Sequence, residues 1–214
     1  MSDRSRRDVS HAADVQILVD VVDHLRLRRV ALLGQSHGAP MAATYAADHP
    51  RAVSHLVLDG MTRFRGEVDA RWTALRALLL ADWQVGSLAM ASVMLAGASS
   101  EEIAAFARLW RCCVSAEMAV ALNDVAILHD LSDVFARLRV PTLVVSRRDD
   151  PLLAPEESRR VAMQISGAEL VILDGSAHLT HAGDVDALVE VVRRFLRGGR
   201  RPATDERARS TRSG

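Results

Sequence analysis

The stretch VALLGQSHGAP, residues 30–40, decides the fold of this chain. Four apolar residues run into a turn in which Ser36 has a glycine two positions away on either side, Gly34 and Gly38. This spacing is typical of a sharp turn from a buried strand into a helix, with the serine hydroxyl pushed outward. We expect side chains at both glycines to collide with the turn or with neighbouring strands. Ser36 is therefore the candidate nucleophile.

Strand and helix patterns alternate on both sides of this turn. Short continuous apolar runs, typical of strands covered on both faces of a parallel sheet, occur at residues 30–33, 53–58, 141–145 and 170–173. Helical spacing of apolar or small residues predicts helices over about 14–25, 42–48, 156–165 and 185–196. The alternation predicts an α/β fold with a mostly parallel sheet flanked by helices.

Residues 62–138 interrupt the alternation, because they contain long helical stretches and no clear strand. They also contain all three tryptophans, which we interpret as core residues, with Trp83 and Trp110 as the candidates to face a substrate. We therefore predict a helical insertion between two parts of an α/β core, residues 13–61 and 139–197. Residues 1–12 and 198–214 are predicted to be disordered tails.

Composition and charge indicate which classes of partner and which cellular compartment to expect. The 214 residues include 27 basic and 27 acidic side chains, so no net charge favours nucleic acid or an anionic membrane. The polar N-terminus lacks the apolar stretch of a secretory signal, and the longest uncharged stretch, residues 84–100, is too short for a comfortable membrane span. Cys112 and Cys113 are predicted to be free thiols on a helix. These features predict a cytoplasmic protein.

A serine nucleophile needs a base, and the base needs an orienting acid. Asp150 follows the predicted strand that ends near residue 146, and His178 follows the one that ends at residue 173. Both therefore lie at carboxyl ends of strands, in the chain order serine, acid, histidine that is expected for a fold with this turn. The backbone N–H of His37, at the start of the next helix, is the predicted donor to a developing oxyanion.

Alternatives remain open at several of these positions. Asp149 is adjacent to Asp150, and Asp59 ends the preceding strand, so either could replace Asp150 as the acid; Asp59 could also be a turn or capping residue. His181 is interpreted as a surface or supporting residue, and the His37 side chain as part of a pocket lining. No two pairs of ligand residues have the spacing of a histidine-based metal site, so we predict no metal. The chemistry of a serine, a histidine and an aspartate implies no cofactor.

From about residue 14 to residue 196 the chain resembles the α/β-hydrolase superfamily, on the segments VALLGQSHGAPMAATYAADHP, VSHLVLDG, VPTLVVSRRDDPLLAPEESRRVA and GAELVILDGSAHL. The segments ADWQVGS, FARLWRCCVSAE and HLTHAGD are similar to a bacterial branch of hydrolase domains, encoded alone or fused to cyclase and LuxR-type regulatory modules. The resemblance implies that Ser36 is the nucleophile, Asp150 the orienting acid and His178 the general base. It also implies that residues 62–138 form a helical cap over the substrate pocket.

The chain departs from this family before the turn. A complete member has several strands upstream of the nucleophile, and one loop among them supplies a second oxyanion donor. Only 29 residues precede Val30, and they hold one predicted helix. We therefore expect a truncated fold in which the strand at residues 30–33 is an unpaired edge that favours a second copy or another partner. The missing donor would lower kcat about 10²–10³-fold.

Two functions follow as expectations. The first is a serine hydrolase that acts on a small ester or related acyl compound through an acyl-enzyme; haloperoxidase-like chemistry and C–C bond hydrolysis use the same three side chains. The second is a non-catalytic regulatory or ligand-binding module, which the missing oxyanion loop and the resemblance to regulator-linked domains both favour.

Overall fold

The computed structural model describes residues 8–61 and 70–198. Within them one parallel sheet has the order β1 (Val30–Gln35), β2 (Val53–Asp59), β3 (Thr142–Arg147), β4 (Glu169–Leu173). The helices are α1 (His11–His24), α2 (Gly38–Asp48), α3 (Ala70–Ala81), α4 (Trp83–Met94), α5 (Ser100–Cys113), α6 (Ala116–Leu128), α7 (Ser132–Arg137), α8 (Pro155–Gln164), α9 (Val185–Gly198) and the short 3₁₀ helix η1 (Thr180–Ala182). The predicted α/β class is confirmed.

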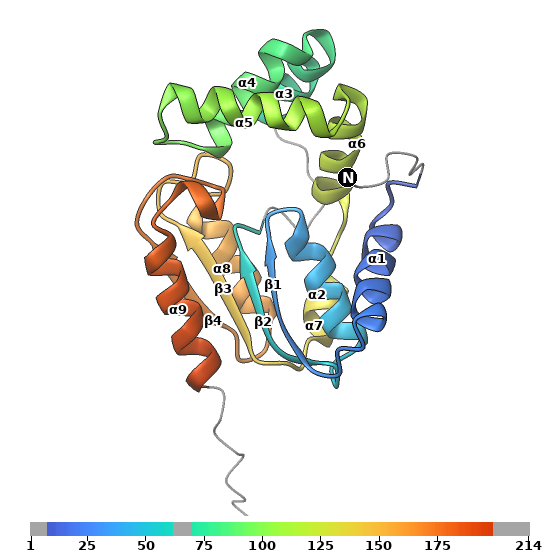
Figure 1. Ribbon diagram of the computed structural model, residues 1–214. Coiled ribbons are helices and arrows are strands. Elements are labelled where there is room, and N and C mark those ends of the chain that lie inside the picture. The colour runs from blue at the N-terminus through green and yellow to red at the C-terminus, as the bar shows by residue number, and fades with distance from the viewer. Residues whose placement is uncertain (1–7, 62–69, 199–214) are drawn as a thin grey trace, which may run out of the picture.

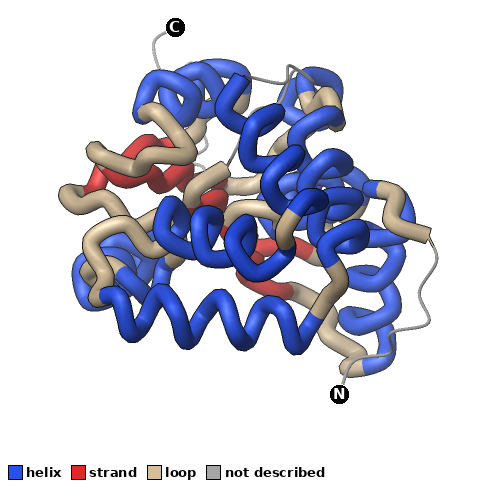
Figure 2. Tube along the Cα trace, turned by 90° about the horizontal axis from the view of Figure 1, so that it is seen from above, coloured by secondary structure: helices blue, strands red, loops and turns tan. Residues whose placement is uncertain are grey.

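Helices cover both faces of the sheet (Figure 1). On one face α2, α7 and α8 pack in the larger core, and α1 packs on α2. On the other face α9 buries Leu188 and Phe195 against Val57 of β2 and Leu143 and Val145 of β3. Seen from above, the helices lie on both sides of the strands (Figure 2). Strands buried between two helical layers explain the continuous apolar runs in the sequence.

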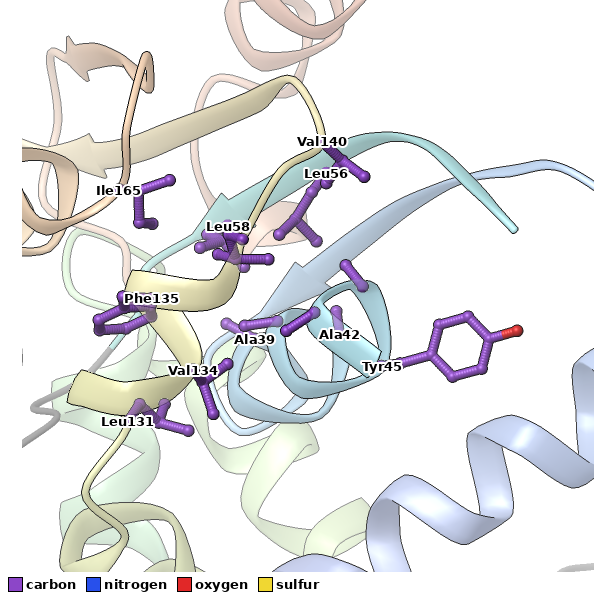
Figure 3. Close-up of a cluster of buried hydrophobic side chains, with 14 of the residues drawn as sticks. Ala39, Ala42, Tyr45, Leu56, Leu58, Leu131, Val134, Phe135, Val140 and Ile165 are labelled. Carbon is purple, nitrogen blue, oxygen red and sulfur yellow. The ribbon is translucent and has the colours of Figure 1, made fainter. Parts of the chain in front are cut away.

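The larger core depends on small residues of α2. Ala39 and Ala42 are almost fully buried and let the helix lie close to Leu56 and Leu58 of β2 (Figure 3). Phe135 of α7 fills the same cluster and is 0% exposed. Helix α7 lies within residues 62–138, the predicted helical insertion, and its buried apolar side chains pack with the sheet and α2.

Helix α1 begins earlier than its apolar spacing predicted. The hydroxyl of Ser10 accepts the backbone N–H of Ala13, so Ser10 caps a helix that starts at His11. Residues 11 and 12, predicted to belong to a disordered tail, are therefore helical. The rest of the predicted tails, residues 1–7 and 199–214, lies outside the described residues, as does the start of the insertion at 62–69.

Strand β1 is an edge of the sheet, because within the described residues it pairs only with β2. The prediction that residues 30–33 are covered on both faces is wrong for the described part of the chain. Val30 and Leu32 pack against the larger core, whereas Leu33 on the opposite side is 48% exposed. The cluster beneath α9 is built from β2, β3 and β4 and leaves this side of β1 uncovered.

Helices α3 to α6, which we call the helical block, lie above the carboxyl ends of the strands (Figure 1). Their core contains Trp72, and Trp83 and Trp110 pack against this core. The rings of Trp83 and Trp110 contact each other edge to face, with centroids 5.0 Å apart. Both cysteines are exposed at the end of α5. No helix in the described ranges combines the length and the apolar character that a membrane crossing needs.

Candidate active site

Ser36 lies on a strained turn between β1 and α2. Its φ of 49° is in the left-handed region, which is uncommon for a residue other than glycine. The turn is fixed from two sides: the Ser36 N–H donates to the carbonyl of Asp59 in the neighbouring strand (2.9 Å), and its carbonyl accepts the N–H of Ala39 (3.0 Å). Strain of this kind, held by surrounding hydrogen bonds, is concentrated at functional sites.

The two glycines of the turn differ in what they require. A Cβ atom on Gly34 would lie 2.6 Å from the carbonyl oxygen of Gly38 and 2.7 Å from the Cα atom of Ala39, so only glycine fits. A Cβ atom on Gly38 would meet no described atom within 4 Å. The predicted collision is therefore confirmed for Gly34 and wrong for Gly38.

The structure brings Ser36, Asp150 and His178 together. The Nε2 atom of His178 lies 2.8 Å from the hydroxyl oxygen of Ser36, and its Nδ1 atom lies 2.7 Å from Oδ2 of Asp150. The ring is almost fully buried, at 1% exposure, and so is the Asp150 side chain. With the ring hydrogen on Nδ1 donated to Asp150, Nε2 is free to accept the serine proton.

Backbone groups hold Asp150 in place. Its Oδ1 atom accepts the N–H groups of Leu152 (2.8 Å) and Leu153 (3.3 Å), which leaves Oδ2 for the histidine. The adjacent Asp149 is exposed and lies on the solvent side of the same turn. The two neighbouring carboxylates therefore have different surroundings, because Asp150 is buried and Asp149 is exposed.

Asp59 belongs to a second buried cluster, which contacts the chain two residues after His178. Its carboxylate accepts the hydroxyl of Thr180 at 2.8 Å and lies 3.7 Å from the guanidinium of Arg147, and both charged side chains are almost fully buried. Burial raises the pKa of the Asp59 carboxyl, and the Thr180 hydrogen bond and the Arg147 charge oppose that increase. Arg147 and Thr180 were not predicted from the sequence. Asp59 ends β2 and Arg147 ends the neighbouring strand β3, and the apolar pattern of the strands does not reveal a charge pair between their ends.

His37 is the first residue after the nucleophile and precedes α2 directly. Its Nε2 atom lies 3.2 Å from Oδ2 of Asp14 in α1, whose side chain is 5% exposed. Asp14 lies in the first turn of α1 and is the partner of the His37 side chain. The ring of His181 lies 6.1 Å from the ring of Phe106 in α5, at the junction with the helical block.

A stacked pair of histidines lies close to the contact between His37 and Asp14. The rings of His11 and His129 stack with centroids 4.0 Å apart, and the Nε2 atom of His11 lies 2.9 Å from the hydroxyl of Thr44. Burial, helped by His129, lowers the pKa of His11 from 6.5 to about 4. In the described ranges, no three histidine, cysteine or acidic side chains are grouped so that they could hold a metal ion.

The chain is similar to known hydrolases. The model of the hydrolase family described as serine aminopeptidase, S33, matches residues 5–186. The proline iminopeptidase PfmaB of Pestalotiopsis fici is 27% identical over 205 residues, covering 84% of this chain and 73% of that protein.

Solved structures show the same fold at lower identity. An esterase from Exiguobacterium antarcticum superimposes with a TM-score of 0.80 at 18% identity, covering 89% of this chain and 75% of that one. A bromoperoxidase from Bacillus anthracis superimposes with a TM-score of 0.84 at 15% identity, covering 92% and 77%. At these identities the likeness concerns the fold alone.

Proposed function

The chain belongs to the α/β-hydrolase family described as serine aminopeptidase, S33, and we propose that it is a serine hydrolase that cleaves an ester or related acyl substrate through Ser36. One observation carries the proposal: a continuous hydrogen-bonded path runs from Asp150 through His178 to the Ser36 hydroxyl. A buried imidazole between a carboxylate and a serine on a strained turn is the arrangement that activates a serine for attack.

In the proposed reaction Ser36 Oγ attacks the carbonyl carbon of the substrate while Nε2 of His178 takes the hydroxyl proton. Asp150 stabilises the imidazolium, and the N–H of His37 donates to the tetrahedral oxyanion. When the intermediate collapses, His178 gives the proton to the leaving alcohol or amine and an acyl-enzyme remains. Water then attacks the acyl group, passes a proton to His178, and the second collapse returns that proton to Ser36.

We assign one oxyanion donor, the N–H of His37, and no second one among residues 8–61 and 70–198. Removal of one donor from a complete oxyanion hole lowers kcat by about 10²–10³. With this one assigned donor, we expect the site to hydrolyse a substrate at a measurable but slow rate.

We further propose that the helical block acts as a cap and shapes the acyl pocket. Its position above the carboxyl ends of the strands, where Ser36 and His178 lie, supports this role (Figure 1). Trp83 and Trp110 form an aromatic contact inside the block and are only partly buried, so they are the residues we expect to limit the size of the acyl group.

Amide substrates are the second candidate class. The relative PfmaB is named a proline iminopeptidase, and the family description is serine aminopeptidase, so removal of an N-terminal residue from a short peptide is the alternative reaction. The two classes use the same three side chains and differ in the leaving group to which His178 returns the proton.

A fluorophosphonate probe tests the proposal directly, because it reacts with an activated serine whatever the natural substrate. We expect the wild-type protein to be labelled, and Ser36→Ala and His178→Ala to remain unlabelled. Ser92→Ala is the matched control, since Ser92 is an exposed serine of α4 whose hydroxyl donates to the carbonyl of Ala89 in the same helix. A wild-type protein that stays unlabelled would contradict the proposal and favour a non-catalytic binding module. Short p-nitrophenyl esters and prolyl p-nitroanilide then separate the two substrate classes.

A further inference from the structure

The loop that carries His178 is hydrogen-bonded to the turn between α4 and α5. The carbonyl of Met94 accepts the backbone N–H of His178 at 3.0 Å and that of Leu179 at 3.2 Å. The hydroxyl of Ser176 donates to the carbonyl of Ala96 at 3.0 Å. Three hydrogen bonds therefore join this loop to the helical block.

The end of α4 and the loop that carries His178 each have backbone groups that need a hydrogen-bond partner. Met94 is the last residue of α4, and the last carbonyls of a helix have no partner inside the helix. His178 and Leu179 are buried, and a buried backbone N–H is almost always hydrogen-bonded. The end of α4 and the histidine loop thus satisfy each other, and separating them would leave unpaired groups on both sides.

The turn has the shape that this contact requires. Gly97 has a φ of 92°, which L side chains rarely adopt, and a Cβ atom there would lie 3.3 Å from the Ser176 hydroxyl oxygen. The N–H of Leu95 closes the helix on Ala91, and the N–H of Ala98 closes the turn on Leu95. The carbonyls of Met94 and Ala96 receive their hydrogen bonds from the histidine loop.

His178 is consequently held from three directions. Its backbone N–H donates to Met94 of the helical block, and its carbonyl accepts the side-chain amide of Gln35, the residue before the nucleophile (3.1 Å). Its ring lies between Ser36 and Asp150. A displacement of the α4–α5 turn would be transmitted to the ring nitrogen that faces the serine.

We propose that Ser176 and the α4–α5 turn, residues 94–97, position His178, so that the helical block and the general base move as one unit. This inference rests on the proposed function, since it assigns the turn a role in proton transfer by His178. Ser176 is a positioning residue: it acts through the loop and the turn. A substrate that shifts the helical block when it binds would thereby change the distance between Nε2 and the Ser36 hydroxyl.

Ser176→Ala tests the proposal, because it removes one of the three hydrogen bonds and no atom of the predicted reaction centre. We expect kcat for p-nitrophenyl acetate and the rate of fluorophosphonate labelling to fall about tenfold, with KM changed less than twofold. Ser176→Thr keeps the hydroxyl and should restore both rates. Ser92→Ala, the same substitution on the exposed side of α4, should change neither.

Gly97→Ala strains the turn itself and should lower kcat about 10²-fold, as a displacement of the base by about 1 Å would. If this variant does not fold, the comparison of Ser176→Ala with Ser176→Thr decides. A Ser176→Ala enzyme with a lower melting temperature and unchanged kcat and labelling rate would overturn the inference and leave the proposed function intact. A wild-type protein without Ser36-dependent labelling would contradict both the inference and the proposed function.

Discussion

The carboxylate of Asp59 accepts the hydroxyl of Thr180 at 2.8 Å, two residues beyond the histidine whose ring is bound by Asp150. The two acids therefore contact the same loop at different places. Asp150 contacts the imidazole, whereas Asp59 anchors the backbone that follows it and forms a buried pair with Arg147.

This division predicts different effects for the two carboxylates. Asp150→Asn should lower kcat about 10³–10⁴-fold, because an amide no longer selects the required tautomer of His178. Asp59→Asn should lower the free energy of unfolding by about 3 kcal/mol, because Arg147 loses its buried counterion, and should lower kcat less than Asp150→Asn. Steady-state kinetics and urea unfolding of both variants check this. A larger loss of kcat in Asp59→Asn would make Asp59 the orienting acid.

The two glycines around Ser36 provide a second matched pair. Gly34→Ala places a methyl group within 2.6–2.8 Å of Gly38, Ala39 and Ala42, so we expect a loss of about 3 kcal/mol or failure to fold. Gly38→Ala meets open space and starts a helix, so we expect no loss of stability. Thermal unfolding measures the difference, and equal melting temperatures for the two variants would contradict it.

His11 should make the fold less stable in acid. Its pKa is lowered to about 4, because burial and the stacked His129 disfavour the imidazolium, while Asp14 favours it and His37 disfavours it. Below pH 6.5 the unfolded chain binds a proton that the folded protein does not bind, so the free energy of unfolding falls as the pH drops from 6.5 to about 4. Because His11 is partly exposed, we expect a contribution of about 1–2 kcal/mol.

His11→Gln tests this contribution, since glutamine can keep a hydrogen bond to Thr44. Urea unfolding at pH 7.5 and pH 5 should show a smaller stability difference in the variant than in the wild type. His24→Gln is the control, because His24 is an exposed histidine of the same helix. An identical pH dependence in the His11 variant and the wild type would refute the prediction.

The exposed apolar side of α1 should promote self-association. Ile17, Val21 and Leu25 follow one another at helical spacing and are 44%, 48% and 57% exposed, and Leu33 of the edge strand β1 is 48% exposed. Within the described residues β1 is an edge strand, and an edge strand and exposed apolar side chains each favour association with a second chain. We expect light scattering to show a dimer or larger species at micromolar concentration.

Val21→Glu should shift that equilibrium towards the monomer. Leu109→Glu is the control, because Leu109 is 60% exposed on α5, in the helical block. A wild-type protein that is monomeric at every concentration, or equal effects of the two variants, would contradict an interface at α1 and β1.

Much of the fold could be predicted from the sequence. The apolar runs located all four described strands, and the helical spacing located α8 and α9 to within two residues. Boundaries were less accurate where a cap or a tertiary contact determines them: α1 starts at its Ser10 cap, and α7 joins the core through Phe135. Local periodicity reports which side of an element is apolar, and it does not report which neighbour covers that side.

For the site, the sequence by itself determined the nucleophile turn, because a serine between two glycines after an apolar run constrains the backbone locally. It also placed Asp150 and His178 just after strands, and parallel strands bring such residues to one edge of a sheet. Only the tertiary structure decided which carboxylate contacts His178, that Asp14 holds His37, and that Met94 accepts the N–H of His178. Those contacts join residues that are 23 to 84 positions apart along the chain, and their distances depend on how helices and loops pack.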